Sequence, residues 1–251
     1  MKQTQKKICD LRCTVFEPDI LNKKNLHLVI LCHGYGAPGN DLLSVGEYLC
    51  QSDSSISKNV CFIFPEGPLS LDNIGLFGSR AWWNIDMIAL QRAIDGIEPR
   101  DLSKDIPNGM PLASNTLMDL VNKLMLDYSI SSTRIILGGF SQGSMITTDV
   151  ALKMEEPPGG LIVMSGTLVC ERVWRKLAQK RGVMKIFQGH GRSDPLLPFN
   201  AAKKLRELFI NAGLDHKFLP FDGFHEIPKE VLLHTSEFIK DLSDQNKTIL
   251  L

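Results

Sequence analysis

The sequence lacks several features that would assign it to a special class of protein. Its 251 residues include 28 basic and 28 acidic side chains, so the formal net charge is zero. A balanced charge gives no general attraction to nucleic acid or to an anionic membrane surface. No run of 18 apolar residues is present, which predicts that the chain has no transmembrane helix. The apolar and charged fractions, 43% and 22%, are those of an ordinary globular protein.

Paired metal-binding cysteines are also missing. The six cysteines show no Cys-x-x-Cys spacing, which argues against a structural zinc site. Cys32 and Cys61 lie within apolar runs, where cysteine serves as a small hydrophobic residue. We expect all six to be reduced thiols, and the basic, polar segment Met1–Cys9 is unlike a signal peptide. The sequence therefore predicts a cytoplasmic protein.

Internal repeats and low-complexity tracts are absent, and apolar runs of strand length alternate instead with helical patterns. This alternation predicts an α/β fold with a mostly parallel sheet, helices on both faces, and a single domain over residues 1–251. The predicted strands are Leu26–Cys32, Val60–Phe64, Arg134–Phe140, Leu161–Ser165 and Lys185–Gln188, with an opening antiparallel edge strand at Lys7–Val15. His216–Phe221 is a weaker strand prediction, because Pro220 fits poorly in a strand interior.

Helical patterns occupy most of the chain between these strands. They cover Asp41–Cys50, Ile85–Gly96, Ser114–Tyr128, Ser144–Met154, Val173–Lys180, Asn200–Ala212 and Lys229–Leu242. Pro65–Asn84 and Glu98–Ala113 lack clear periodicity, and long irregular segments of this kind are often functional or mobile. A group of basic residues is interpreted as the solvated face of a helix: Arg172, Arg175, Lys176, Lys180 and Arg181.

One motif indicates a nucleophile. Ser141 lies in Gly139-Phe140-Ser141-Gln142-Gly143, a Gly-x-Ser-x-Gly pattern that chance supplies in roughly one of ten chains of this length. The motif follows an apolar strand pattern and precedes a helical one, which is the setting of a nucleophile elbow. Such a turn projects the serine hydroxyl beyond the carboxyl end of a strand, where open α/β sheets bind ligands. The alternative is a glycine-rich turn without a catalytic role.

A serine hydroxyl needs a general base at neutral pH. Among the six histidines, His225 lies between the last predicted strand and the last helix, at the same sheet edge as Ser141. A carboxylate must fix the tautomer of this base, and Asp194 follows the preceding strand at that edge. Asp222 and Glu226 are rivals from the histidine's own loop. The favoured order Ser141, Asp194, His225 is that of α/β-hydrolases.

Two backbone N–H groups are candidates for an oxyanion hole. The turn His33-Gly34-Tyr35-Gly36 follows a predicted strand, and Gln142 opens the helix after the nucleophile. We nominate the N–H groups of Tyr35 and Gln142, since each such donor is typically worth about 3 kcal/mol in the transition state. His33 is interpreted as a hydrogen-bonding brace for its turn.

Four apolar residues are candidates for the wall of a substrate pocket, because they follow a strand at the same sheet edge. They are Leu76, Phe77, Trp82 and Trp83. The alternative is that both tryptophans pack their loop onto the body of the protein. If the four form a pocket, short-to-medium acyl chains are the expected substrates.

Several segments resemble the phospholipase/carboxylesterase family, small α/β-hydrolases that include carboxylesterases, lysophospholipases and acyl-protein thioesterases. The segments are HGYGAPGNDL, FPEGP, AWW, GGFSQGS, GHGRSDPLLPF and GFHEIP, within roughly residues 26 to 240. The resemblance implies a triad of Ser141, Asp194 and His225, oxyanion donors at Tyr35 and Gln142, no metal and no organic cofactor. Many members have leucine and aspartate where this chain has Tyr35 and Ala37, so the pocket wall differs.

The sequence therefore predicts a serine esterase that cleaves small-molecule or lipid carboxylic esters through an acyl-enzyme, without nucleic acid or integral membrane association. An acyl-protein thioesterase is the alternative within the family, and segment 98–113 looks longer than in compact thioesterases. Two further alternatives are a metal hydrolase that uses His190, Asp194 and His225, and a non-catalytic binding protein on the same scaffold. The oligomeric state stays open.

Overall fold

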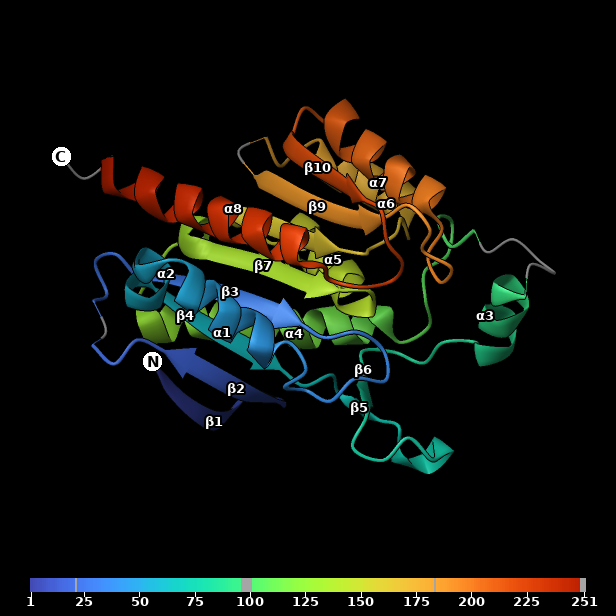
Figure 1. Ribbon diagram of the computed structural model, residues 1–251, viewed down its shortest axis with the longest axis horizontal. Coiled ribbons are helices and arrows are strands. Elements are labelled where there is room, and N and C mark those ends of the chain that lie inside the picture. The colour runs from blue at the N-terminus through green and yellow to red at the C-terminus, as the bar shows by residue number, and fades with distance from the viewer. Residues whose placement is uncertain (21, 96–100, 183, 249–251) are drawn as a thin grey trace.

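The apolar runs of the sequence form one eight-stranded sheet in the order β1-β2-β4-β3-β7-β8-β9-β10 (Figure 1). The computed structural model describes residues 1–20, 22–95, 101–182 and 184–248. The strands are β1 (Lys2–Ile8), β2 (Leu11–Glu17), β3 (His27–Cys32), β4 (Val60–Pro65), β7 (Ile135–Phe140), β8 (Gly160–Met164), β9 (Lys185–Gly191) and β10 (Asp215–Phe221). The last six of these run parallel, whereas β1 and β2 pair antiparallel with their neighbours.

Helices cover both faces of this sheet, and each face has its own apolar core. Along β3, Leu28 and Ile30 enter one core while Val29 and Leu31 enter the other, as the alternation of side chains in a strand requires. The first core contains α4 (Met110–Tyr128), α5 (Gln142–Lys153), α6 (Glu171–Ala178) and α7 (Phe199–Asn211). The second contains α1 (Leu43–Ser52), α2 (Ser54–Asn59) and α8 (Lys229–Thr248). The predicted α/β architecture is confirmed.

Two predictions at the edges of the sheet need correction. The single strand predicted at Lys7–Val15 is wrong, because a tight turn at Cys9, with φ of 50°, reverses the chain and makes two strands, β1 and β2. The weakly predicted strand containing Pro220 does form, as β10. It is the outermost strand, so one of its sides is unpaired, and a residue without an N–H is tolerated there.

The irregular stretch after β4 contains a small hairpin of β5 (Leu69–Ser70) and β6 (Arg80–Ala81), with a 3₁₀-helix at Asp72–Ile74 between them. The next element, α3 (Met87–Ile94), stands beyond the carboxyl ends of the parallel strands (Figure 1). The predicted end of this helix at Gly96, and residues 98–100 of the aperiodic segment, lie outside the described residues. Within the described chain, no helix is both long and apolar enough to cross a membrane.

His216 on β10 is a partly buried histidine on the edge of the first core. Its ring lies 5.6 Å from the ring of Phe209, centroid to centroid, and its Nε2 lies 2.9 Å from the side-chain oxygen of Gln188. Burial, followed by the nearby positive charge of Arg206, lowers the pKa of His216 from 6.5 to about 4. The folded protein therefore holds this side chain neutral at neutral pH.

We expect the free energy of unfolding to fall as the pH drops from about 6.5 to about 4. In that window the unfolded chain binds a proton at His216 and the folded protein does not. This difference lowers the free energy of unfolding by up to about 3 kcal/mol. The variant His216→Gln keeps an amide donor for Gln188 and should show a shallower fall in urea unfolding between pH 7 and 4.5. An identical slope in variant and wild type would contradict this.

Candidate active site

Ser141 occupies a strained turn between β7 and α5. Its backbone angles are φ 54° and ψ −119°, a combination that costs a residue with a side chain roughly 1–3 kcal/mol. Two hydrogen bonds hold the turn: the Ser141 N–H donates to the Met164 carbonyl at 2.9 Å, and the Ser144 hydroxyl donates to the Ser141 carbonyl at 2.7 Å. The structure thus has the strand-turn-helix geometry of a nucleophile elbow.

The second motif glycine explains why this turn is so tight. A Cβ added at Gly143 would lie 1.9 Å from the carbonyl oxygen of Cys32, so only glycine permits this contact between α5 and the end of β3. The contact places the first N–H groups of α5, which have no partner within the helix, beside the turn that follows β3. The two nominated oxyanion donors, Tyr35 and Gln142, belong to these two segments.

Asp194 and His225 form a short hydrogen bond. The distance between Asp194 Oδ2 and His225 Nδ1 is 2.7 Å, and the carboxylate is fully buried. The other oxygen, Oδ1, accepts from the backbone N–H groups of Leu196 and Leu197, both at 2.9 Å. Burial raises the pKa of Asp194, but the hydrogen bond and charge of His225 and the Leu197 N–H outweigh it, so the net pKa lies below the ordinary value. The carboxylate is therefore held ionised.

The two rival carboxylates point elsewhere. Asp222 is 95% exposed and pairs with Arg192 at 3.2 Å, while Glu226 accepts the N–H of Phe224 within its own loop. Neither forms a hydrogen bond with the ring of His225. Of the three carboxylates weighed from the sequence, Asp194 is the one whose side chain bonds to the histidine.

The loops that carry Asp194 and His225 are packed directly against each other. A Cβ at Gly191 would lie 2.1 Å from the carbonyl oxygen of Phe224, so glycine is required at this close approach. The Ser193 N–H donates to the Gly223 carbonyl at 3.0 Å across the same contact. On the other side, the ring of Phe140 lies 4.8 Å from the ring of His225, centroid to centroid. Phe140 directly precedes Ser141, so the histidine packs beside the elbow.

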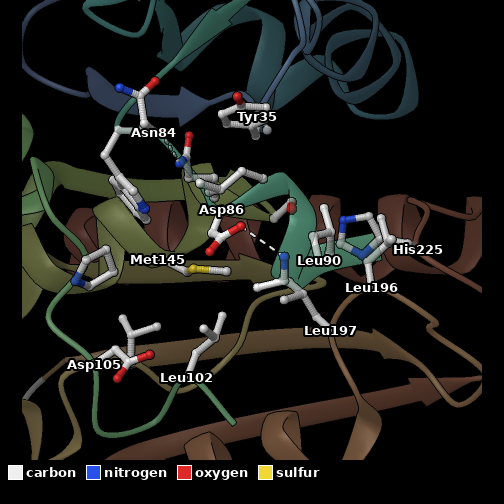
Figure 2. A pocket seen from close by; sticks show the side chains of 18 of the residues that line it. Tyr35, Asn84, Asp86, Leu90, Leu102, Asp105, Met145, Leu196, Leu197 and His225 are labelled. Atoms are coloured by element: carbon white, nitrogen blue, oxygen red, sulfur yellow. Dashed lines mark hydrogen bonds between the residues drawn. The ribbon is translucent and has the colours of Figure 1, made fainter. Parts of the chain in front are cut away.

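One cavity of about 610 Å³ is lined by four of the residues predicted to act in catalysis: Ser141, His225, Tyr35 and Gln142. Figure 2 shows His225 and Leu196 together at one side of the hollow. Much of the remaining apolar wall is formed by Trp83, Ile85, Leu90, Leu102, Met145, Val169, Leu196 and Leu197. Of these, Ile85, Leu90, Leu102 and Val169 lie outside the motif segments. Leu90 belongs to α3, so the helix beyond the sheet edge closes one side of the site.

The four residues predicted to form the pocket wall have different positions. Trp83 lines the cavity, whereas Leu76 and Phe77 are not among its lining residues, and Phe77 is 84% exposed on the loop after the 3₁₀-helix. Trp82 is buried, and its Nε1 donates to the His33 carbonyl at 3.1 Å. Trp82 therefore packs its strand onto the turn, which is the alternative raised for it above.

The side chains of Gln142 and His33 hold the site together. Gln142 accepts the N–H of Trp82 at 2.9 Å and donates to the Trp83 carbonyl at 2.8 Å, which ties the elbow to β6 and the residues after it. His33 Nε2 accepts the N–H of Gly67 at 2.9 Å, while Nδ1 donates to the Gly34 carbonyl. The bracing role predicted for His33 is confirmed. The bracing role of the Gln142 side chain was not predicted, because only its backbone belongs to the motif.

The metal-site alternative does not match the orientation of these side chains. His190 and His225 both approach Asp194, but the ring nitrogen of His190 nearest to it, Nε2, lies 2.8 Å from the Leu197 carbonyl. A carbonyl oxygen can only accept a hydrogen bond, so this nitrogen carries the proton and has no lone pair for a cation. Throughout the described part of the chain, no group of three histidine, cysteine or acidic side chains has an arrangement suited to a metal ion.

A serine on a strained elbow, in a cavity at the carboxyl edge of a doubly covered parallel sheet, is the arrangement of serine ester hydrolases with the α/β-hydrolase fold. Residues 18–243 match the model of the phospholipase/carboxylesterase family. The chain belongs to this family and is a serine ester hydrolase, as the sequence predicts.

Similar proteins agree with this family. Acyl-protein thioesterase 1 of Debaryomyces hansenii is 27% identical over 221 residues, which cover 85% of this chain and 90% of that protein. The protein of the same name from Saccharomyces cerevisiae is 26% identical over 220 residues, or 84% and 91% of the two chains. Among solved structures, esterase PE8 superposes with a TM-score of 0.71 at 21% identity and covers 96% of this chain and 100% of its own. That likeness shows the fold.

We expect Gln142→Met to destabilise the protein by about 2 to 4 kcal/mol, because it leaves the buried Trp82 N–H and Trp83 carbonyl without partners. Urea unfolding measures this directly. The matched control is Gln51→Met on the exposed face of α1, which should change the free energy of unfolding by less than about 0.5 kcal/mol. Equal small effects at both positions would contradict the bracing role.

Proposed function

We propose that this enzyme hydrolyses carboxylic esters through an acyl-enzyme formed on Ser141. The observation that supports this most strongly is the shared cavity, which brings the elbow serine together with His225, a histidine already bonded to a buried carboxylate. Because Nδ1 of His225 donates to Asp194, Nε2 is the nitrogen left to accept the serine proton. A serine, a correctly oriented base and an ionised orienting group are the parts that acyl transfer needs.

The reaction then has two similar halves. In the first, Ser141 Oγ attacks the ester carbonyl while His225 takes its proton, and the N–H groups of Tyr35 and Gln142 stabilise the oxyanion. His225 gives the proton to the departing alcohol, which leaves an acyl group on Ser141. In the second half, water is deprotonated by His225 and attacks the acyl-enzyme, and the serine leaves with the returned proton. No other group is required.

The lining of the cavity favours a neutral ester with an apolar acyl chain. Its wall is mainly aliphatic and aromatic, and its charged lining residues are Asp41, Asp86, Asp101 and Asp105, with no lysine or arginine among the lining residues described. Asp101 is paired with Lys204 at 3.2 Å, while Asp86 Oδ1 accepts the Ala89 N–H (dashed line in Figure 2). A strongly anionic group placed inside would meet these carboxylates, which disfavours it.

A thioester substrate is the second candidate, supported by relatives that are named acyl-protein thioesterase 1. The same acyl-enzyme forms from a thioester, since only the leaving group differs. We also propose that the enzyme is cytoplasmic, and its six free cysteines support this, because a reducing compartment keeps such thiols free.

We expect Ser141→Ala to reduce kcat on p-nitrophenyl butyrate by roughly 10⁵-fold or more, and Asp194→Asn by roughly 10⁴-fold through the wrong histidine tautomer. The matched control is Asp222→Asn, which removes an exposed carboxylate two residues after Pro220 and should stay within about twofold of wild type. Near-normal turnover by Ser141→Ala would refute the nucleophile, and a larger loss at Asp222 than at Asp194 would refute the orienting group.

Acyl-chain preference tests the proposed pocket. From acetyl to octanoyl p-nitrophenyl esters, kcat/KM should rise, because each buried methylene contributes about 0.8 kcal/mol. Leu90→Gln, on the cavity wall, should flatten this series, whereas Leu112→Gln, at a 73% exposed position of α4, should not. A flat series in the wild type would contradict an apolar acyl slot. Matched octanoyl thioesters, assayed in parallel, show which leaving group the enzyme prefers.

A further inference from the structure

His190 is a fully buried histidine that the proposed reaction does not use. It lies near the end of β9, with no side-chain exposure. Its Nε2 is 2.8 Å from the Leu197 carbonyl and 3.3 Å from Asp194 Oδ2, the same carboxylate oxygen that binds His225. Its other nitrogen, Nδ1, is buried without a hydrogen-bond partner.

These contacts fix the protonation state of the ring. Both oxygens near Nε2 are acceptors, so Nε2 carries the proton. The lone pair of Nδ1 has no hydrogen-bond donor among the described residues. A second proton on Nδ1 would create a buried charge with an unpaired N–H, which is costly. Consistent with this, burial lowers the pKa of His190. The ring is therefore a neutral donor, whose one N–H bonds to the Leu197 carbonyl and lies close to Asp194 Oδ2.

The hydrogen bond from His190 to the Leu197 carbonyl closes the loop that carries the carboxylate. Asp194 Oδ1 accepts from the N–H groups of Leu196 and Leu197, and the Leu197 carbonyl in turn accepts from His190. The two leucines also line the cavity. The segment from His190 to Leu197 is thus a closed hydrogen-bonded unit, anchored on a strand of the central sheet, and it sets both the position of Asp194 and part of the acyl wall.

We propose that His190 is a positioning residue for the triad: its Nε2–H binds the carbonyl of Leu197, the residue whose own N–H bonds to Asp194 Oδ1, and so holds the carboxylate in line with Nδ1 of His225. This inference rests on the proposed function, in which Asp194 orients the base. As a neutral donor, His190 supports the carboxylate without neutralising it. The full negative charge of Asp194 remains available to the imidazolium that forms on His225.

Removal of this donor has a defined structural consequence. Without the bond from His190, the Leu197 peptide is held less firmly, so the hydrogen bond between Asp194 Oδ2 and His225 Nδ1 loses its fixed geometry. The other charged groups nearby are occupied: Arg192 pairs with Asp222, and Glu226 accepts the Phe224 N–H. Among the carboxylates near His225, Asp194 is therefore the one whose hydrogen bonds change when His190 is replaced.

The experiment compares His190→Phe, which keeps a ring beside Phe199 but has no donor, with His190→Gln, which offers an amide donor. The matched control is His216→Phe, another histidine with a buried, unpartnered Nδ1 but bonded to Gln188, away from the triad. The readouts are the pH dependence of kcat/KM on p-nitrophenyl butyrate and the low-field proton NMR signal of the His225 Nδ1–H.

For His190→Phe we expect kcat to fall about 10- to 100-fold with KM changed less than about threefold, and both the acid limb of the pH profile and the low-field signal to move. His190→Gln should recover at least part of kcat and the acid limb of the wild-type pH profile. His216→Phe should change neither the acid limb nor the low-field signal. An unmoved limb and signal in His190→Phe would overturn the proposal. The NMR signal does not depend on turnover, so this outcome is distinct from an inactive enzyme or a failed nucleophile assignment.

Discussion

The contact between the start of α5 and the end of β3 is the constraint on which the active site depends. Gly143 lies so close to the Cys32 carbonyl that no side chain fits, and this closeness forces the chain to turn sharply at Ser141. The turn bears a strained backbone, which the hydrogen bonds from Ser141 and Ser144 hold in place. The same approach brings Tyr35 and Gln142 to one cavity. The positions of the proposed nucleophile and the proposed oxyanion donors are thus consequences of one packing contact.

The remaining parts of the site are joined to this contact by buried hydrogen bonds. Gln142 ties the elbow to Trp82 and Trp83, and His33 ties the neighbouring turn to Gly67. On the other side, the loops of Asp194 and His225 are locked together at Gly191. Buried polar groups are costly when unpaired, so each of these bonds also specifies one arrangement of the loops. A rigid frame of this kind is what acyl transfer needs, because its donors must be in place before charge develops.

The shared location of the residues proposed for catalysis was predictable from the sequence, because strand order and loop position determine which groups share a sheet edge. Ser141, Asp194 and His225 each follow a strand, and parallel strands end on the same side. The wall of the cavity was not predictable in the same way. Leu90 on α3 and Leu102 come from segments that carry no motif, and only the three-dimensional path of the chain brings them to the cavity. Leu76 and Phe77 looked equally suitable, but the small hairpin turns them outward.

The hydrogen bonds by which side chains brace the site could not be predicted from the sequence pattern either. Gln142 and His190 stand inside motif segments, yet their roles depend on distances to Trp82, Trp83, Leu197 and Asp194 that spacing does not encode. Likewise, Pro220 lowered the expectation of a strand at β10, since only its place at the sheet edge makes proline harmless. Local sequence thus predicts the chemistry, and tertiary packing decides how it is supported.

Covalent trapping of the nucleophile tests the proposed role of Ser141. The wild-type enzyme is treated with a fluorophosphonate, digested, and mapped by mass spectrometry. The account predicts one phosphonylated residue, Ser141, with labelling that slows in Asp194→Asn because the base is misoriented. A stable adduct on a different serine, or no adduct in an enzyme that still turns over esters, would contradict it.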